Sequence, residues 1–400
     1  MKKKEKLNIE KKIWDFVDNN TYLIYFVIIT ILALVIRVLL FKYKSGDYDM
    51  FLKPWFDELR LYGGLPGLAY NIGNYTPIYM TILALLTYLP ISSVTSIKIV
   101  SLIFDFVGAS FAYKIVIELL KNKNYREKIA LIIYGLYLLL PTVFLNSAYW
   151  AQSDSIYTAF VLISIYYLIK NNFIKGIIFF SIAFAFKFQT IFIFPLYVLM
   201  YFNDRKIKFR YFLIIPLTVF ILSLPKVIYT GNLLCGFEVY FNQSNTYSQY
   251  LTLNFPNIYS IYFNNGNSNL INTPLKEMGT IGIIGTLMIF VTIALLVYKK
   301  KIRFNNETII DFALWSILIC TFFLPQMHER YLFMADVISL IYLVIHKDKY
   351  YVPIIIELIS LNGYMYLLFS GFAVNISVLS VIYLALIILY TKDMYKKYFK

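Results

Sequence analysis

Five short polar motifs interrupt a chain that is otherwise rich in apolar residues. They lie at positions 45–49, 75–77, 150–154, 187–189 and 328–331. Between them they supply carboxylates that could take a proton, cations that could bind an anion, and amide and hydroxyl groups that could hold a polar substrate. The sequence has no Gly-rich phosphate loop and no zinc-like spacing of His and carboxylates. These motifs are therefore the main candidates for chemistry.

Two carboxylates, Asp47 and Asp49, stand one residue apart in the first motif. In an extended segment, side chains at alternate positions face the same way. The pair could then bind a divalent cation, or one carboxylate could act as a general base while the other orients it. A plain turn that uses Asp and Gly is the alternative.

The middle motifs add further polar side chains. Gln152 and Asp154 stand at the mouth of a predicted helix, where Asp154 could line a polar site or could simply be the helix N-cap. Tyr75 and Gln189 could donate or accept hydrogen bonds from a substrate. We count these four residues as candidate binding residues.

The cations come later in the chain, at Lys187, His328 and Arg330. Lys187 is about eleven residues from either cytoplasmic flank of its apolar run, so it can reach the outer side or a polar cavity but hardly the inner side. Arginine has a rigid fork that matches phosphate, and a neighbouring histidine can add a second donor. The three residues predict an anion-binding cluster, and an ordinary loop cap is the alternative for the motif at 328–331.

Composition indicates which elements hold these motifs. Apolar residues make up 60% of the 400 positions and aromatic residues 19%, while only 15% are charged; soluble domains carry about a quarter charged residues. So few polar groups cannot cover a soluble surface. We therefore predict one all-α, polytopic membrane domain over residues 1–400. Two cysteines, Cys235 and Cys320, argue against a disulfide framework or a thiolate metal site.

Charge gives the expected orientation of the spans. We predict about twelve, at 22–41, 97–119, 129–146, 156–169, 176–186, 188–201, 211–229, 280–298, 310–326, 331–346, 350–369 and 373–391. The segments 176–186 and 188–201 could also be two half-spans around a break. The connections and termini expected on one side hold 26 of the 37 Lys and Arg residues. By the positive-inside rule, both termini are cytoplasmic.

Two long segments are expected on the outer side. The apolar stretch 77–90 is too short to span and suits an interfacial or re-entrant piece, so 42–96 becomes the first outer loop. Within it, an amphipathic helix on the outer leaflet is predicted from the apolar spacing of Phe51, Leu52, Trp55, Leu59 and Tyr62. The second outer loop, 230–279, is rich in Asn, Tyr, Ser and Gln.

Other ionisable residues have simpler interpretations. Arg37 is expected to reach the interface or pair with a loop carboxylate. Asp105 is first a structural ion-pair candidate, and Asp336 has no assigned role. His346 lies beside Lys347 and is expected to be solvated.

In this order, the five motifs resemble those of the GT-C membrane glycosyltransferases, most closely the bacterial mannosyltransferases similar to the GPI-anchor second mannosyltransferase. The resemblance covers essentially the whole chain. It rests on Gly46-Asp47-Tyr48-Asp49, Tyr75-Thr76-Pro77, Trp150-Ala151-Gln152-Ser153-Asp154, Lys187-Phe188-Gln189 and His328-Glu329-Arg330-Tyr331. Two departures are Ala151, where the family usually has Gly, and Phe188, where it usually has Pro.

The resemblance implies an inverting transfer of a monosaccharide, a hexose such as mannose, from a polyprenyl-phosphate donor to a cell-envelope glycan or lipid. A first-loop Asp would be the base, here Asp47 or Asp49, with Asp47 slightly favoured. Gln152 and Asp154 would line the sugar and acceptor site. Lys187, His328 and Arg330 would hold the donor phosphate.

The same resemblance implies no required metal cofactor, with a divalent cation at Asp47 and Asp49 as the alternative. Its partners would be the lipid-linked donor, the acceptor and membrane lipid, and no nucleic acid. The site would open outside the cell membrane. Two rival functions stay open, a flippase or transporter of lipid-linked sugars and a glycan polymerase or ligase. A transporter is the less favoured because the sequence has no internal repeat.

Overall fold

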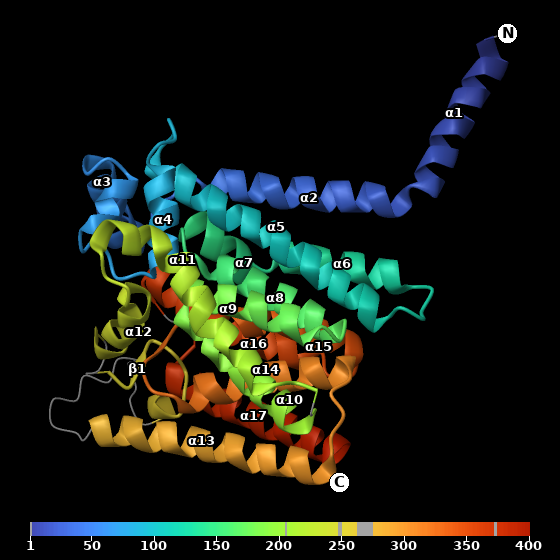
Figure 1. Cartoon of the computed structure of the whole chain (residues 1–400). Helices are drawn as coiled ribbons and strands as arrows, with labels where there is room; N and C mark the ends of the chain where they lie inside the picture. Colours follow the sequence, from blue (N-terminus) through green and yellow to red (C-terminus); the bar gives the residue numbers. More distant parts are fainter. Residues whose placement is uncertain (1, 205, 247–249, 262–274, 372–373) are drawn as a thin grey trace.

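The computed structural model describes residues 2–204, 206–246, 250–261, 275–371 and 374–400, most of them helical (Figure 1). The helices are α1 (Lys2–Asn19), α2 (Thr21–Leu40), α3 (Lys53–Leu61), α4 (Pro77–Leu86), α5 (Ser93–Leu119), α6 (Arg126–Leu139), α7 (Pro141–Phe144), α8 (Asp154–Ile169), α9 (Phe173–Phe186), α10 (Phe194–Asn203), α11 (Ile214–Thr230), α12 (Cys235–Thr246), α13 (Leu275–Lys300), α14 (Asn306–Phe323), α15 (Phe333–Ile345), α16 (Tyr351–Phe369) and α17 (Ile376–Tyr398). Two strands of two residues each, β1 (Thr252–Leu253) and β2 (Met327–His328), pair in parallel. The predicted all-α class is confirmed.

Seven stretches of helix in the described part of the chain are long and apolar enough to cross a membrane. They are α2, α5, Phe209–Thr230, Glu277–Lys300, α14, α16 and α17. The pair Arg126–Leu139 and Pro141–Tyr149 bends by 48° and would make an eighth. These helices confirm a protein with several candidate spans. Other predicted segments form apolar helices of 10–17 residues, shorter than the roughly 20 residues that a span needs, so the twelve crossings stay a prediction.

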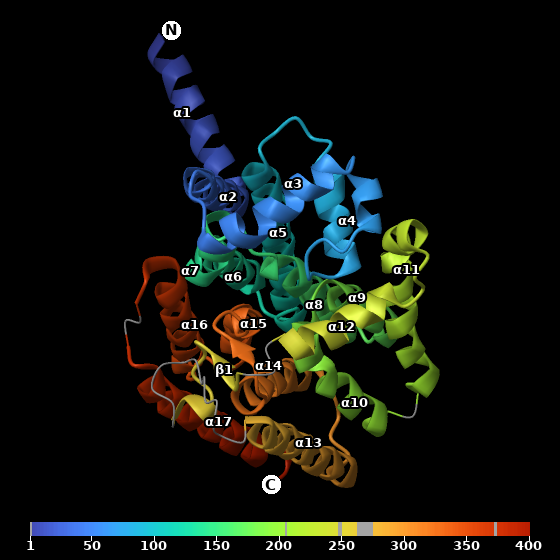
Figure 2. The same cartoon turned by 90° about the vertical axis from the view of Figure 1, so that its left-hand side faces the viewer.

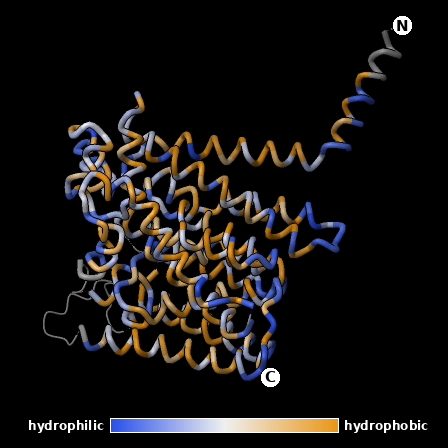
Figure 3. The backbone as a smooth tube through the Cα atoms, viewed as in Figure 1, coloured by the Kyte–Doolittle hydropathy of each residue, from blue (hydrophilic) through white to orange (hydrophobic). Residues whose placement is uncertain are grey.

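The two ends of the helical bundle differ in character. One end carries α1, the α5–α6 connection and the C terminus, and hydrophilic residues gather at that connection (Figures 1 and 3). The other end carries α3, α4, α12 and β1, and Figure 2 views the molecule from there. All the motifs that could do chemistry belong to segments at this second end.

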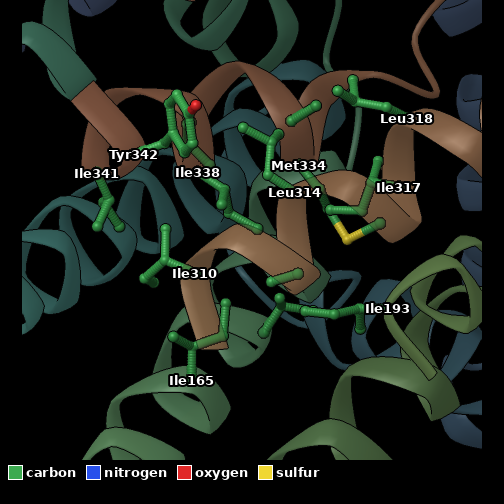
Figure 4. Packing of buried hydrophobic residues seen from close by; sticks show 14 of the residues in the cluster. Ile165, Ile193, Ile310, Leu314, Ile317, Leu318, Met334, Ile338, Ile341 and Tyr342 are labelled. Atoms are coloured by element: carbon green, nitrogen blue, oxygen red, sulfur yellow. The ribbon is translucent and has the colours of Figure 1, made fainter. Parts of the chain in front are cut away.

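Helix α14 occupies the centre of the bundle, and 83% of its apolar stretch is buried inside the protein. Its residues Ile310, Leu314 and Ile317 pack with Ile338 of α15 and with Ile165 of α8 (Figure 4). A helix that is apolar all round lies either in a protein core or against lipid, and α14 lies in the core. By contrast, only 11% of the apolar stretch of α2, and likewise of α13, is buried inside the protein, as expected for helices that face lipid.

Residues 42–96, predicted to be the first outer loop and called the first outer region below, form a small core of their own. A π-helical turn (Tyr48–Leu52) leads into α3, and Leu52, Phe56 and Leu59 turn their side chains inward. They pack against α4 residues, including Met80. The predicted amphipathic helix is therefore present, but its buried face includes Phe56, whereas Tyr62 is 38% exposed.

The apolar run 176–201 breaks at Lys187. Helix α9 ends at Phe186, Lys187 is extended (φ −154°, ψ 131°), and the 3₁₀ helix η4 (Phe188–Ile193) leads into α10. The break forms without proline at position 188. It places Lys187 between two helical pieces, where its side chain can point into the end of the bundle.

Residues 230–279, predicted to be the second outer loop and called the second outer region below, are described in part. This region contains α12, β1 and a short 3₁₀ helix, η6 (Tyr259–Ile261), whereas residues 247–249 and 262–274 of the predicted loop lie outside the described residues. Thr252 lies opposite Met327 and Leu253 opposite His328. This pairing, which the sequence does not predict, brings the second outer region beside the motif at 328–331.

Five buried or half-buried ionisable residues are used structurally, away from the motifs. Arg37 donates to the Asp105 carboxylate at 2.8 Å, and Ser360 donates to Asp336 at 2.7 Å. His346 is not merely solvated, because its Nε2 lies 2.8 Å from the buried carboxylate of Asp311. The expectation of a solvated His346 was wrong. Asp311 lies in the second turn of α14, and its side chain contacts His346 at the C-terminal end of α15.

Candidate functional site

Seven segments of the chain converge on one cavity of about 280 Å³ at the α3 end of the bundle. Its lining comes from the first outer region, the segment before α8, the α9–η4 break, α12, the paired β1 and β2 segments, and α16. Each of the five motifs contributes at least one residue. The structure therefore brings one candidate carboxylate, Asp47, together with the three candidate cations.

Asp47 is held in the cavity by two N–H donors. Trp150 Nε1 donates to Asp47 Oδ2 at 2.9 Å, and Gln152 Nε2 donates to the same oxygen at 2.8 Å. The side chain keeps 27% of its surface exposed, and Arg330 Nη1 lies 3.7 Å away. Asp47 is thus a fixed carboxylate with one face open to the cavity.

Asp49 does not share that position. It is exposed and does not line the cavity. The expectation that both carboxylates face one way is wrong because the segment is helical rather than extended. In a helix, residues two apart point to different sides. The geometry therefore separates two carboxylates that the sequence left nearly equivalent.

Asp154 lies behind the cavity as a buried anchor for the cations. It is the first residue of α8, so it is not the N-cap, a position held by Ser153. Its carboxylate accepts from Asn146 Nδ2 at 2.9 Å and from Lys187 Nζ. Arg330 Nε lies 3.6 Å from the same carboxylate.

Lys187 and Arg330 both enter the cavity already paired. Their side chains are only 12% and 14% exposed. Arg330 Nη1 donates to Glu329 at 2.9 Å, and the guanidinium lies 5.4 Å from the centre of the Trp150 ring. A buried cation is costly unless it is paired, and each of these two cations has a carboxylate beside it.

Glu329 completes the cluster, with its carboxylate 3% exposed. Burial alone would raise the pKa of Glu329, but the interaction with His328 and the charge of Arg330 outweigh it and hold the pKa below its usual value. His328 Nδ1 lies 3.7 Å from the Glu329 carboxylate. Glu329 therefore acts as a fixed anion that orients its two neighbours.

The remaining predicted residues line the same cavity. Tyr75 donates to Gln152 Oε1 at 3.3 Å, and Gln152 in turn holds Asp47. Gln189 lies on η4 with only 8% of its surface exposed. Ala151 adopts φ +65°, a left-handed conformation that favours glycine. Alanine therefore stands at a position where the glycine that is usual in the resembled family would fit the backbone better.

Three polar atoms on the cavity wall have no hydrogen-bond partner among the described residues. They are Arg330 Nε, Gln189 Oε1 and Asn254 Oδ1, all buried. The 3.6 Å from Arg330 Nε to Asp154 is too long for a hydrogen bond. Buried polar groups are nearly always satisfied in native proteins. A polar ligand or water in this cavity would satisfy them.

Several residues of this arrangement were not predicted as site residues. Asn254 joins it from a distant segment, whereas Asn146 lies just before the motif at 150–154 and donates to Asp154. Nothing in their local sequence marks either residue. Trp150 and Glu329 belong to recognised motifs, and their position beside predicted site residues was the available signal. Among the described residues, no group of three or more His, Cys, Asp or Glu side chains could hold a metal ion.

Comparisons with known proteins assign no family to this chain. No protein family model matches it, and no curated protein matches it. The family resemblance therefore rests on the five motifs.

Proposed function

We propose that this protein is an inverting GT-C-type glycosyltransferase that moves a hexose, such as mannose, from a polyprenyl-phosphate donor to a cell-envelope glycan or lipid at the outer membrane face. The observation that carries the proposal is the 3.7 Å approach of Arg330 to Asp47 in one cavity. A carboxylate that can take a proton then lies beside a cation that can hold a phosphate. Glycosyl transfer from a phosphate needs both groups at one place.

The proposed step is a single displacement. The acceptor hydroxyl gives its proton to Asp47 as its oxygen attacks the anomeric carbon. The bond from that carbon to the phosphate oxygen breaks, and its electron pair leaves with the polyprenyl phosphate. Trp150 and Gln152 keep Asp47 pointed at the cavity through the bonds to Oδ2.

The phosphate site is proposed at Arg330, with Lys187 and His328 beside it. Arg330 Nε has no hydrogen-bond partner among the described residues, so it can donate to a phosphate oxygen without breaking an existing hydrogen bond. The charge that develops on the leaving phosphate would fall next to a cation in a largely buried place, where charge interactions are strong. Asp154 and Glu329 hold the cations there before the substrate arrives.

The cavity also has an apolar side that suits a lipid chain. Phe51, Leu52 and Trp55 of the first outer region line it, together with Phe186 and Leu367. Phe51 is 44% exposed, although it is a large apolar residue. An isoprenoid tail in the bilayer could pack against these side chains while its phosphate reaches Arg330.

Purified protein in lipid nanodiscs tests the proposal. A labelled hexose on a polyprenyl monophosphate should be transferred to an envelope glycolipid fraction, giving a new glycosidic bond. Transfer only from a diphosphate-linked oligosaccharide would indicate a polymerase or ligase. Movement of the labelled lipid across sealed vesicles without a new glycosidic bond would indicate a flippase. Either of these results would overturn the proposal.

A further inference from the structure

A second cavity, of about 350 Å³, adjoins the candidate site on the α12 side. Asn74, Tyr75 and Gln243 line both cavities. Gln243 Nε2 donates to the Asn74 carbonyl at 2.8 Å, so a single hydrogen bond between the first and second outer regions lies on the shared wall. The two cavities therefore share part of their wall.

The chemistry of the second cavity differs from that of the first. Its lining is rich in neutral groups that both donate and accept, namely Tyr70, Asn71, Thr230, Asn232 and Asn242. Amides and hydroxyls of this kind match the paired donors and acceptors of sugar hydroxyls. The lining therefore favours a ligand with many hydroxyl groups.

An aromatic face completes the match. Tyr70 lines the cavity and its ring stacks on that of Tyr62, with 3.9 Å between the ring centres. Tyr70 is 49% exposed, so the stacked pair keeps a free surface. A tyrosine combines an apolar ring with a polar tip, which suits the C–H face and the hydroxyls of a pyranose.

The charges of the second cavity argue against a phosphate. Lys226 and Glu238 both line it, one of each sign, and both act on the nearby Cys235. Glu238 also accepts from Asn232 Nδ2 at 2.9 Å. A cavity with one cation and one anion has no net preference for an anionic headgroup.

Tyr75 connects the second cavity to the candidate base. It lines both cavities, and its hydroxyl donates to Gln152, whose amide holds Asp47. A ligand in the second cavity that extends past Tyr75 would present a hydroxyl to Asp47. The donor would meanwhile occupy the cavity with Arg330.

We propose that the second cavity binds the neutral sugar units of a glycan acceptor and directs one of their hydroxyls toward Asp47. This inference rests on the proposed function and names the acceptor as a glycan rather than a phospholipid. The recognising residues are Tyr70 and Asn71 from the first outer region, opposite Asn242 of α12.

Binding in the absence of donor tests this inference. The full-length protein in nanodiscs, prepared without glycoside detergents, is titrated with neutral trisaccharides of glucose, galactose, mannose and N-acetylglucosamine, and with hexyl phosphate for comparison. Tyr70→Ala and Asn71→Ala should each weaken binding of the preferred trisaccharide by about tenfold, the typical value of one lost contact. The matched control is Tyr350→Ala, an exposed tyrosine at the other end of the bundle.

The outcomes separate this inference from the proposed function. Asp47→Asn should slow hexose transfer and so tests the proposed function, whereas Tyr70→Ala and Asn71→Ala test the second cavity, which Asp47 does not line. If a trisaccharide binds and Tyr70→Ala weakens that binding, but no hexose is transferred, the glycan site in the second cavity is supported and the proposed glycosyltransferase function is overturned. If hexose is transferred but neither Tyr70→Ala nor Asn71→Ala weakens trisaccharide binding, only the glycan site in the second cavity is overturned. Unfolding temperatures of the variants, with Asn71→Ala as the milder change at an exposed residue, exclude misfolding as the cause.

Discussion

Arg330 is the residue on which the charge balance of the site depends. It contacts the carboxylates of Asp47, Asp154 and Glu329 and lies over the Trp150 ring. The compact ammonium group of a lysine lacks the planar fork that lets Arg330 approach all of these groups at once. The planar guanidinium is therefore part of the geometry as well as of the charge.

Arg330→Lys should slow hexose transfer by 10²–10³-fold, which is the usual cost of losing one donor that stabilises a developing charge. Lysine keeps the charge but lacks the Nε–H that has no partner in the cavity. Single-turnover transfer rates measure the effect. Arg126→Lys, at an exposed ion pair with Glu127, is the control and should be silent. Equal rates for the two variants would contradict the role of Arg330.

Glu329 should make the folded protein less stable as the pH falls into the acid range. Its pKa is held below its usual value in the folded protein, so its contribution to stability is complete above the ordinary Glu pKa of about 4.3. That contribution is lost as the pH falls through the lower, folded value. Unfolding temperatures between pH 7 and pH 3 should fall less steeply for Glu329→Gln than for wild type. An unchanged slope in Glu329→Gln would refute the assignment.

At the scale of elements, the site depends on close approaches between segments that are far apart in the sequence. Helix α16 approaches the motif at 328–331 so closely that a Cβ on Gly363 would lie 2.8 Å from Glu329 Cβ and 3.0 Å from its carbonyl oxygen. Backbone atoms cannot move aside cheaply. Gly363 therefore sets how far Glu329 and Arg330 reach into the cavity.

Gly363→Ala should lower the free energy of unfolding by about 1–3 kcal/mol, the usual cost of overpacking, and should slow hexose transfer. Gly285→Ala is the matched control, since that helical glycine has open space around its Cβ position and alanine is the better helix former. Thermal unfolding in detergent and transfer rates measure both. A neutral Gly363→Ala would contradict the close packing of α16 on this motif.

Much of the helical layout was predictable because long apolar runs form helices in a membrane protein. The break at Lys187 was foreseen as well, since a lysine interrupts an apolar run there. The separation of Asp47 from Asp49 was not predictable, because it depends on a π-helical turn whose inner face packs on α4. The β1–β2 pairing and the contribution of Asn254 join segments more than 70 residues apart, and no local pattern marks such a contact.

At the scale of the whole molecule, the candidate site and the basic connections lie at opposite ends of the bundle (Figures 1 and 3). Lys123 belongs to the α5–α6 connection, whereas Asn71 belongs to the first outer region. If the basic end is cytoplasmic, as the positive-inside rule predicts, the candidate cavity opens outside the cell.

Cysteine labelling tests this orientation. In a chain with Cys235→Ser and Cys320→Ala, a membrane-impermeant maleimide on intact cells should label Asn71→Cys and should spare Lys123→Cys. Both positions are exposed, so both should react once the membrane is opened. Labelling of Lys123→Cys alone in intact cells would reverse the topology and remove the outer-face site.

The central claim is that Asp47, and not Asp49, takes the proton from the acceptor beside a phosphate-binding Arg330. The most direct measurement is the rate of hexose transfer from a polyprenyl monophosphate by purified wild type, Asp47→Asn and Asp49→Asn, each checked for an unchanged unfolding temperature. We expect a loss of about 10²–10⁴-fold for Asp47→Asn, the usual contribution of a general base, and a nearly normal rate for Asp49→Asn. A normal rate for Asp47→Asn, or a loss confined to Asp49→Asn, would contradict it.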